Sequence, residues 1–72
     1  MGHWNYRVMR RLNESKEYEF GIYEVFYDDN GHVISWTENS LTPICSSKED
    51  LLYEFQIMKE AFEKEVLPYT ET

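Results

Sequence analysis

Residues 18–31 read YEFGIYEVFYDDNG and carry the strongest structural signal in the chain. Aromatic and β-branched residues predominate in the first ten positions, and these residue types favour a pleated strand. They are apolar on both faces, which is typical of a central strand with a cover on each side of the sheet. The segment Asp28–Gly31 then supplies the Asn-Gly pair whose positive φ angles suit a tight hairpin. We therefore expect a central strand over Tyr18 to Asp28 that ends in a hairpin.

Strands are expected on both sides of this central one. From His3 to Leu12 most even positions are apolar and most odd positions are polar, a period of two that indicates a strand. The polar residues 13–17 suit a hairpin loop between this strand and the central one. A third strand is expected from His32 to about Glu38. The three strands would form an antiparallel meander.

The hairpin at Gly31 allows two registers. A two-residue turn pairs Asp29 with His32, whereas a three-residue turn with Gly31 in a bulge pairs Asp28 with His32. A slip of one residue would move every side chain of the third strand to the other face. We favour the three-residue turn, because it places the apolar residues of both strands on one face: Ile34 and Trp36 with Phe20, Ile22 and Phe26.

The last third of the chain predicts one amphipathic helix. Residues 46–50 read SSKED and offer two overlapping capping boxes, Ser46 with Glu49 or Ser47 with Asp50. Pro68 would end the helix after roughly twenty residues. Apolar residues at helical spacing form one stripe: Leu51, Phe55, Met58, Phe62 and Val66. The prediction is a single α+β domain over residues 1–72, a three-stranded antiparallel β-meander with one C-terminal helix packed on one face (βββα).

The helix can cover only one of the two sheet faces. The odd face is expected to be open and to serve as a binding or dimer surface, since contiguous exposed apolar patches mark association. Its members combine aromatic residues and arginines, which are enriched at interfaces: Arg7, Met9, Arg11, Tyr23, Val25, Tyr27 and Val33. Tyr53 and Ile57 lie on the other side of the helix from the stripe and form a second exposed apolar pair.

Composition narrows the class of function. The net charge is −7, so nucleic acid is not an expected partner. One cysteine and no apolar leader or membrane-spanning run predict a soluble cytoplasmic protein. Three His and Cys residues in total are too few for a structural zinc site, and Cys45 is expected to be an inert, partly buried thiol. No catalytic residues, metal site or cofactor are predicted, and the protein is not expected to be an enzyme.

The order of several short motifs resembles a group of small uncharacterised bacterial proteins. These open on a Trp-Asn-Tyr-Arg strand, here Trp4 to Arg7, and carry a Ser-Trp-Thr strand, here Ser35 to Thr37, before a helix. The resemblance implies no activity. The leading hypothesis is a homodimeric protein-interaction module of regulatory or inhibitory type, as in phages and mobile elements. The alternative is a binder of a small anionic ligand such as a nucleotide, with Arg7 and Arg11 on the anion and Tyr23 or Tyr27 stacked on a ring.

Overall fold

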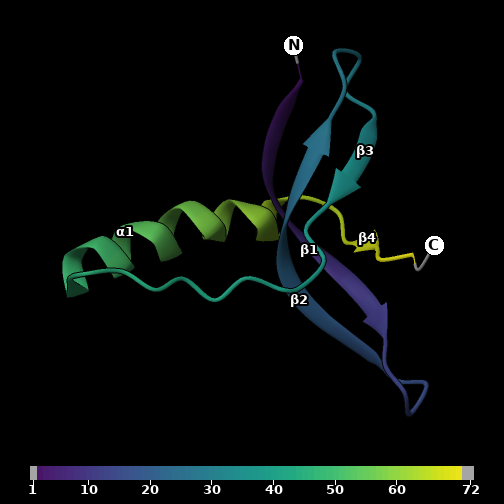
Figure 1. Cartoon of the computed structure of the whole chain (residues 1–72), viewed down its shortest axis with the longest axis horizontal. Helices are drawn as coiled ribbons and strands as arrows, with labels where there is room; N and C mark the ends of the chain where they lie inside the picture. Colours follow the sequence, from purple (N-terminus) through teal and green to yellow (C-terminus); the bar gives the residue numbers. More distant parts are fainter. Residues whose placement is uncertain (1, 71–72) are drawn as a thin grey trace.

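A long N-terminal β-hairpin is the largest part of the fold (Figure 1). The structure is a computed structural model that describes residues 2–70. It is an α+β fold with a four-stranded mixed sheet in the order β3-β2-β1-β4 and one C-terminal helix. The elements are β1 (His3–Leu12), β2 (Tyr18–Tyr27), β3 (Val33–Trp36), α1 (Lys48–Met58), the 3₁₀ helix η1 (Lys59–Glu63) and β4 (Leu67–Pro68).

The first hairpin has the predicted strands and loop. β1 and β2 pair without interruption from His3 opposite Tyr27 to Leu12 opposite Tyr18. The Oδ1 atom of Asn13 accepts hydrogen bonds of 2.9 Å from the backbone N–H groups of Ser15 and Glu17, which closes the loop locally. Even positions of β1 therefore pair with even positions of β2, so the two sheet faces are the predicted odd and even sets.

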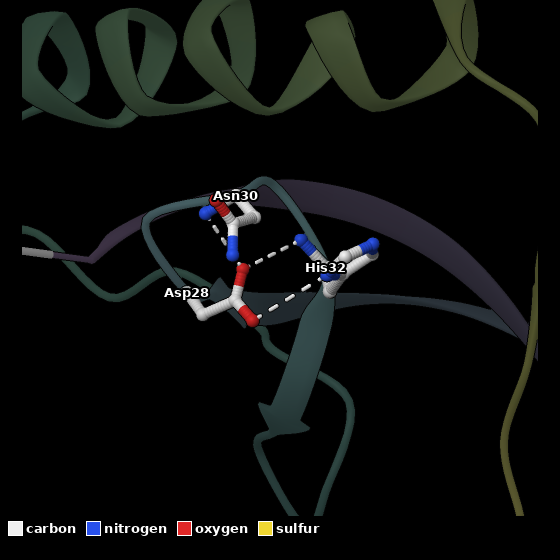
Figure 2. A network of polar contacts seen from close by, with 3 residues as sticks. All are labelled: Asp28, Asn30 and His32. Carbon is white, nitrogen blue, oxygen red and sulfur yellow. Dashed lines mark hydrogen bonds and ion pairs between the residues drawn. The ribbon is translucent and has the colours of Figure 1, made fainter.

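The second hairpin uses the predicted three-residue turn. The Asp28 N–H donates to the His32 carbonyl at 2.9 Å, and Gly31 has φ +82°, in the left-handed region that glycine adopts without strain. Figure 2 shows the Asp28 carboxylate inside this turn. Its Oδ1 atom accepts from the backbone N–H groups of Asn30 and His32, both at 2.9 Å, and its Oδ2 atom lies 3.6 Å from His32 Nδ1. The turn is thus held by its own side chains.

A β-bulge two residues further on changes the predicted face of β3. Tyr27 pairs with Val33, but Phe26 pairs with Ser35, which leaves Ile34 as the extra residue. Trp36 consequently pairs with Val25 and packs on the odd face. The prediction that Trp36 shares a face with Phe20, Ile22 and Phe26 is wrong, because the bulge adds one residue after the turn has set the register.

A fourth strand was not predicted. β4 runs parallel to β1, with Leu67 opposite Met9 and Pro68 opposite Arg10, and the Tyr69 N–H donates to the Arg10 carbonyl at 2.8 Å. Proline is tolerated here because β4 is an edge strand, where a missing N–H donor breaks no interior ladder. The sheet is therefore mixed and four-stranded, not a three-stranded antiparallel meander.

The helix begins as predicted and ends early. Ser47 is the N-cap: its hydroxyl accepts from the Asp50 N–H at 3.1 Å, as in the second of the two capping boxes. After Met58 the chain tightens into η1, and Lys64 is already extended (φ −113°, ψ 161°). Pro68 is not the helix terminator, since it lies in β4.

The helix does not lie along the sheet. Figure 1 shows residues 39–47 running out from the sheet and α1 returning beside them, so the two segments form a projecting arm. Most of the contact with the sheet is made by η1, which packs against β1, and Glu54 of α1 accepts a hydrogen bond of 3.5 Å from Tyr6. The radius of gyration is 13.3 Å, larger than the roughly 11 Å expected of a compact chain of this length. The prediction of a helix packed on one sheet face is wrong for most of its length.

Candidate interaction surface

The odd sheet face is buried within the chain. Met9, Tyr23, Val25 and Tyr27 form the core cluster, and Met9 and Val25 are fully buried. The C-terminal segment covers this face: partly buried side chains of Trp36, Leu67 and Tyr69 pack against the cluster. The expectation that the odd face is open is therefore wrong, because the six residues after the helix return to the sheet and supply the second cover.

The two arginines of this face tie the C-terminal segment down. Arg7 Nη1 donates to the Tyr27 hydroxyl at 3.0 Å, and its Nη2 donates to the Glu65 carbonyl at 2.6 Å. The Tyr27 hydroxyl in turn donates to Asn5 Oδ1 at 2.7 Å. Arg7 thus links β1 and β2 to the chain just before β4.

Arg11 has a similar role further along β1. Its guanidinium carbon lies 4.1 Å from the centre of the Tyr69 ring, and its Nη1 atom donates to the Glu38 carbonyl at 3.3 Å. The Tyr69 hydroxyl donates to the same carbonyl at 3.0 Å. Both arginines therefore hold the C-terminal segment on the sheet, and an anion at this face would compete with these contacts, although the buried Arg7 Nε has no partner among residues 2–70. Val33, the last predicted member, is partly exposed at the edge of the face.

The even sheet face is the exposed one. Where η1 packs, Val8 is buried, but towards the ends of the strands large apolar side chains face solvent. Phe20 is 65% exposed although it lies within a ten-residue strand. We call the exposed apolar residues of this face the open sheet face: Trp4, Leu12, Tyr18 and Phe20. Leu12 pairs directly with Tyr18, and Phe20 follows two residues later on the same strand, so these three side chains are neighbours on one face. Arg10, opposite Phe20, completes the group, with its guanidinium carbon 5.8 Å from the centre of the Tyr18 ring.

The predicted apolar stripe of the helix is divided between two environments. Met58 and Ala61 are buried, whereas Phe55 and Phe62 are 52% and 69% exposed. With 3.6 residues per turn in α1 and three in η1, Leu52, Phe55 and Phe62 lie on one side of the arm. These three residues, all exposed, are called the arm stripe below. Of the predicted second pair, Tyr53 is 63% exposed and Ile57 is half buried.

A cavity of about 270 Å³ lies at the base of the arm. Its walls come from β1, β2, α1 and residues 41–45: Tyr6, Glu24, Leu41, Thr42, Pro43, Ile44, Cys45, Glu54 and Met58. The Tyr6 hydroxyl forms a long hydrogen bond of 3.5 Å to Glu54 Oε2. Burial raises the pKa of Tyr6, and the negative charges of Glu54 and then Glu24 raise it further, as does the hydrogen bond to Glu54. The cavity therefore holds a neutral phenol beside two carboxylates.

In the part of the chain that the structure describes, no group of three or more His, Cys, Asp and Glu side chains is placed to hold a metal ion. None of the helices within residues 2–70 combines the length and hydrophobicity needed to cross a bilayer.

Comparison of the chain with protein-family models, with curated proteins and with solved structures finds no match. The function is therefore argued from these surfaces.

Sequence reasoning missed both surfaces for one reason. The pair Leu67 and Tyr69, spaced two residues apart around Pro68, is the signal for β4, but it is too short to be distinguished from a terminal loop. Without β4, the helix is the sole candidate cover, and the even face is its natural place. With β4 present, Leu67 and Tyr69 cover the odd face, and the helical segment packs on β1 mainly through its last turn and η1.

Proposed function

We propose that the chain is a non-enzymatic protein-interaction module that works as a homodimer. The open sheet face and the arm stripe are its binding surfaces, in place of the odd face. Contiguous exposed patches of large apolar side chains are uncommon on monomeric proteins and mark association. Both surfaces here are rich in phenylalanine, tyrosine or tryptophan, which interface cores favour.

The amount of exposed surface carries this proposal. The chain exposes 5801 Å², whereas a compact monomer of 8.8 kDa exposes about 4,800 Å². The excess of about 1,000 Å² is close to the roughly 800 Å² that each partner buries in a standard interface. Association would bring the exposed area per chain back to the value expected for its mass.

A regulatory or inhibitory role in the bacterial cytoplasm fits the charge of the chain. With a net charge of −7, a homodimer would present a strongly acidic surface outside its apolar interface. Charge complementarity raises association rates and favours partners of opposite sign. A basic protein surface is therefore the second partner that we propose for the dimer.

The alternative of a small anionic ligand has less support. Arg7 and Arg11 already bind backbone carbonyls and aromatic groups of their own chain. An anion would have to displace these contacts and loosen the C-terminal segment. A thermal-shift screen with nucleotides and inorganic phosphate tests this alternative, since a rise in melting temperature would favour it over the interaction module.

Sedimentation equilibrium of the unmodified chain tests the dimer directly. We expect a concentration-dependent approach to twice the chain mass in the micromolar range. A chain that sediments as a monomer at every concentration up to the millimolar range would contradict the proposal. Adding 1 M salt is the control: an interface built on apolar contacts should persist when exposed charges are screened.

A further inference from the structure

We infer that the arm of a second copy covers the open sheet face, and that the exchange is reciprocal. Leu52 and Phe55 of one copy pack on Leu12, Tyr18 and Phe20 of the other, and the same contact is repeated about a two-fold axis. This inference rests on the proposed dimer and names the two surfaces that meet in it. It differs from a dimer made by two sheets or by two helices alone.

The arm cannot cover the open sheet face of its own chain. Met58 and Ala61 are buried where the arm meets β1, and this contact fixes the end of the helix on the middle of the even face. The rest of α1 projects from the sheet (Figure 1), with Glu54 still within 3.5 Å of the Tyr6 hydroxyl. Leu52 and Phe55 are exposed on this arm, whereas the patch formed by Leu12, Tyr18 and Phe20 lies at the loop end of the first hairpin.

The dimensions of the arm suit a second copy. The eleven residues of α1 span about 16 Å at 1.5 Å per residue. The patch from Tyr18 to Phe20 and across to Leu12 is about 7 Å long and one strand spacing wide, so one or two helical turns can cover it. A helix carrying Leu52 and Phe55 one turn apart presents apolar contacts over that length.

Symmetry favours this pairing over a different partner. Each chain carries one exposed arm stripe and one exposed sheet patch, so two copies together supply two of each. A two-fold axis that places one arm on the other chain's patch satisfies both at once and closes the assembly. With antiparallel arms, the free end of each α1 points to the sheet of the other copy, while its η1 end stays on its own β1. The chain exposes about 1,000 Å² more than a compact monomer of its mass, which is enough surface for a standard interface once the flanks of the arm join the contact.

Two charge substitutions and their mixture test the exchange. Phe20→Lys introduces a charge into the sheet patch, and Phe55→Glu introduces one into the arm stripe. Both side chains are more than half exposed in the single chain, so circular dichroism should show a folded protein in each case. Each variant alone should dimerise on the order of a hundredfold more weakly than the unmodified chain, since both copies lose a central aromatic contact.

The equimolar mixture should restore association. In a heterodimer of the two variants, one junction joins the unmodified Phe20 to the unmodified Phe55, and the other joins the introduced lysine to the introduced glutamate. The mixture should therefore form a dimer at least about tenfold more tightly than either variant alone. Leu12→Lys with Leu52→Glu is an independent pair that should behave in the same way.

The outcomes separate this inference from the proposed dimer. A monomeric unmodified chain would overturn both. A dimer that Phe20→Lys weakens but Phe55→Glu does not would be joined by its sheets, and the reverse pattern would indicate a helix pair; either result overturns the exchange and leaves the dimer. Absence of restoration in both mixtures also overturns it.

The matched control is Tyr53→Glu, on the other side of α1, which should leave dimerisation unchanged. A loss as large as that of Phe55→Glu would show that the wrong side of the arm was chosen.

Discussion

Replacing Tyr69 with alanine should remove a large part of the stability of the fold. Its ring lies 5.5 Å from that of Tyr23 and 5.7 Å from that of Trp36, and aromatic pairs contribute about 0.5–1.5 kcal/mol each. The Arg11 guanidinium at 4.1 Å adds about 0.5–1 kcal/mol, and the hydrogen bond to the Glu38 carbonyl adds about 1 kcal/mol. Together these contacts predict a loss of about 2.5–5 kcal/mol. A domain of this length has a total stability of about 4–11 kcal/mol.

Urea unfolding of three chains at one protein concentration measures the effect. The free energy of unfolding should fall in the order unmodified chain, Tyr69→Phe, Tyr69→Ala, with the phenylalanine variant about 1 kcal/mol below the unmodified chain. Tyr53→Ala is the matched control, since it removes an equally large but exposed ring and should cost less than about 1 kcal/mol. If Tyr69→Ala lost no more than this control, the C-terminal segment would not be the cover of the odd face.

Three further predictions concern other parts of the molecule. Because the pKa of Tyr6 is raised in the folded chain, its stabilising contribution is present below about pH 10 and is lost as the pH rises through the raised value; Tyr6→Phe should therefore flatten the fall of stability measured by urea unfolding between about pH 9 and 11. Gly31→Ala should cost about 1–2 kcal/mol through its φ of +82° alone, since nothing lies within 4 Å of the added methyl, and Gly31→Asn should cost less in the same assay. Met58→Ala should lower the free energy of unfolding by about 2–3 kcal/mol, whereas Phe62→Ala, at a residue 69% exposed, should lower it by less than about 1 kcal/mol when measured under dissociating, dilute conditions.

Features set by neighbouring residues were predictable from the sequence. The three-residue turn at Gly31 depends on the Asp28 carboxylate and the freedom of glycine, both within the turn. The start of α1 depends on the Ser47 hydroxyl and the Asp50 N–H three residues later. The pairing of Leu12 with Tyr18 follows from the length of the loop between them. Each of these is decided within six residues of sequence.

Features set by distant residues were not predictable in the same way. A period of two shows which side chains share a face of β2, but it does not show which face receives a cover. Leu67 and Tyr69 decide that question, and they lie at least forty residues after the end of β2. The bulge at Ile34 then moves Trp36 to the covered face, where it meets Tyr69. The prediction reversed the covered and exposed faces because the covered face is determined by contacts between the C-terminal segment and the first hairpin.

Because the odd face is covered and the even face is exposed, the proposed association surfaces are the open sheet face and the arm stripe. Six tyrosines, four phenylalanines and two tryptophans exceed what one cover can bury, whichever face it takes. In the structure Tyr23 and Tyr27 of the odd face are buried, and the Tyr27 hydroxyl donates to Asn5 Oδ1, while the phenylalanines at positions 20 and 55 remain exposed. A tyrosine hydroxyl can be satisfied at either kind of surface, but a phenylalanine ring gains nothing from water. Leu12 and Phe20 of the open sheet face and all three residues of the arm stripe can thus be buried against another chain without desolvating a polar side-chain group. This is why we propose that the chain associates through the open sheet face and the arm stripe, and not through the odd face.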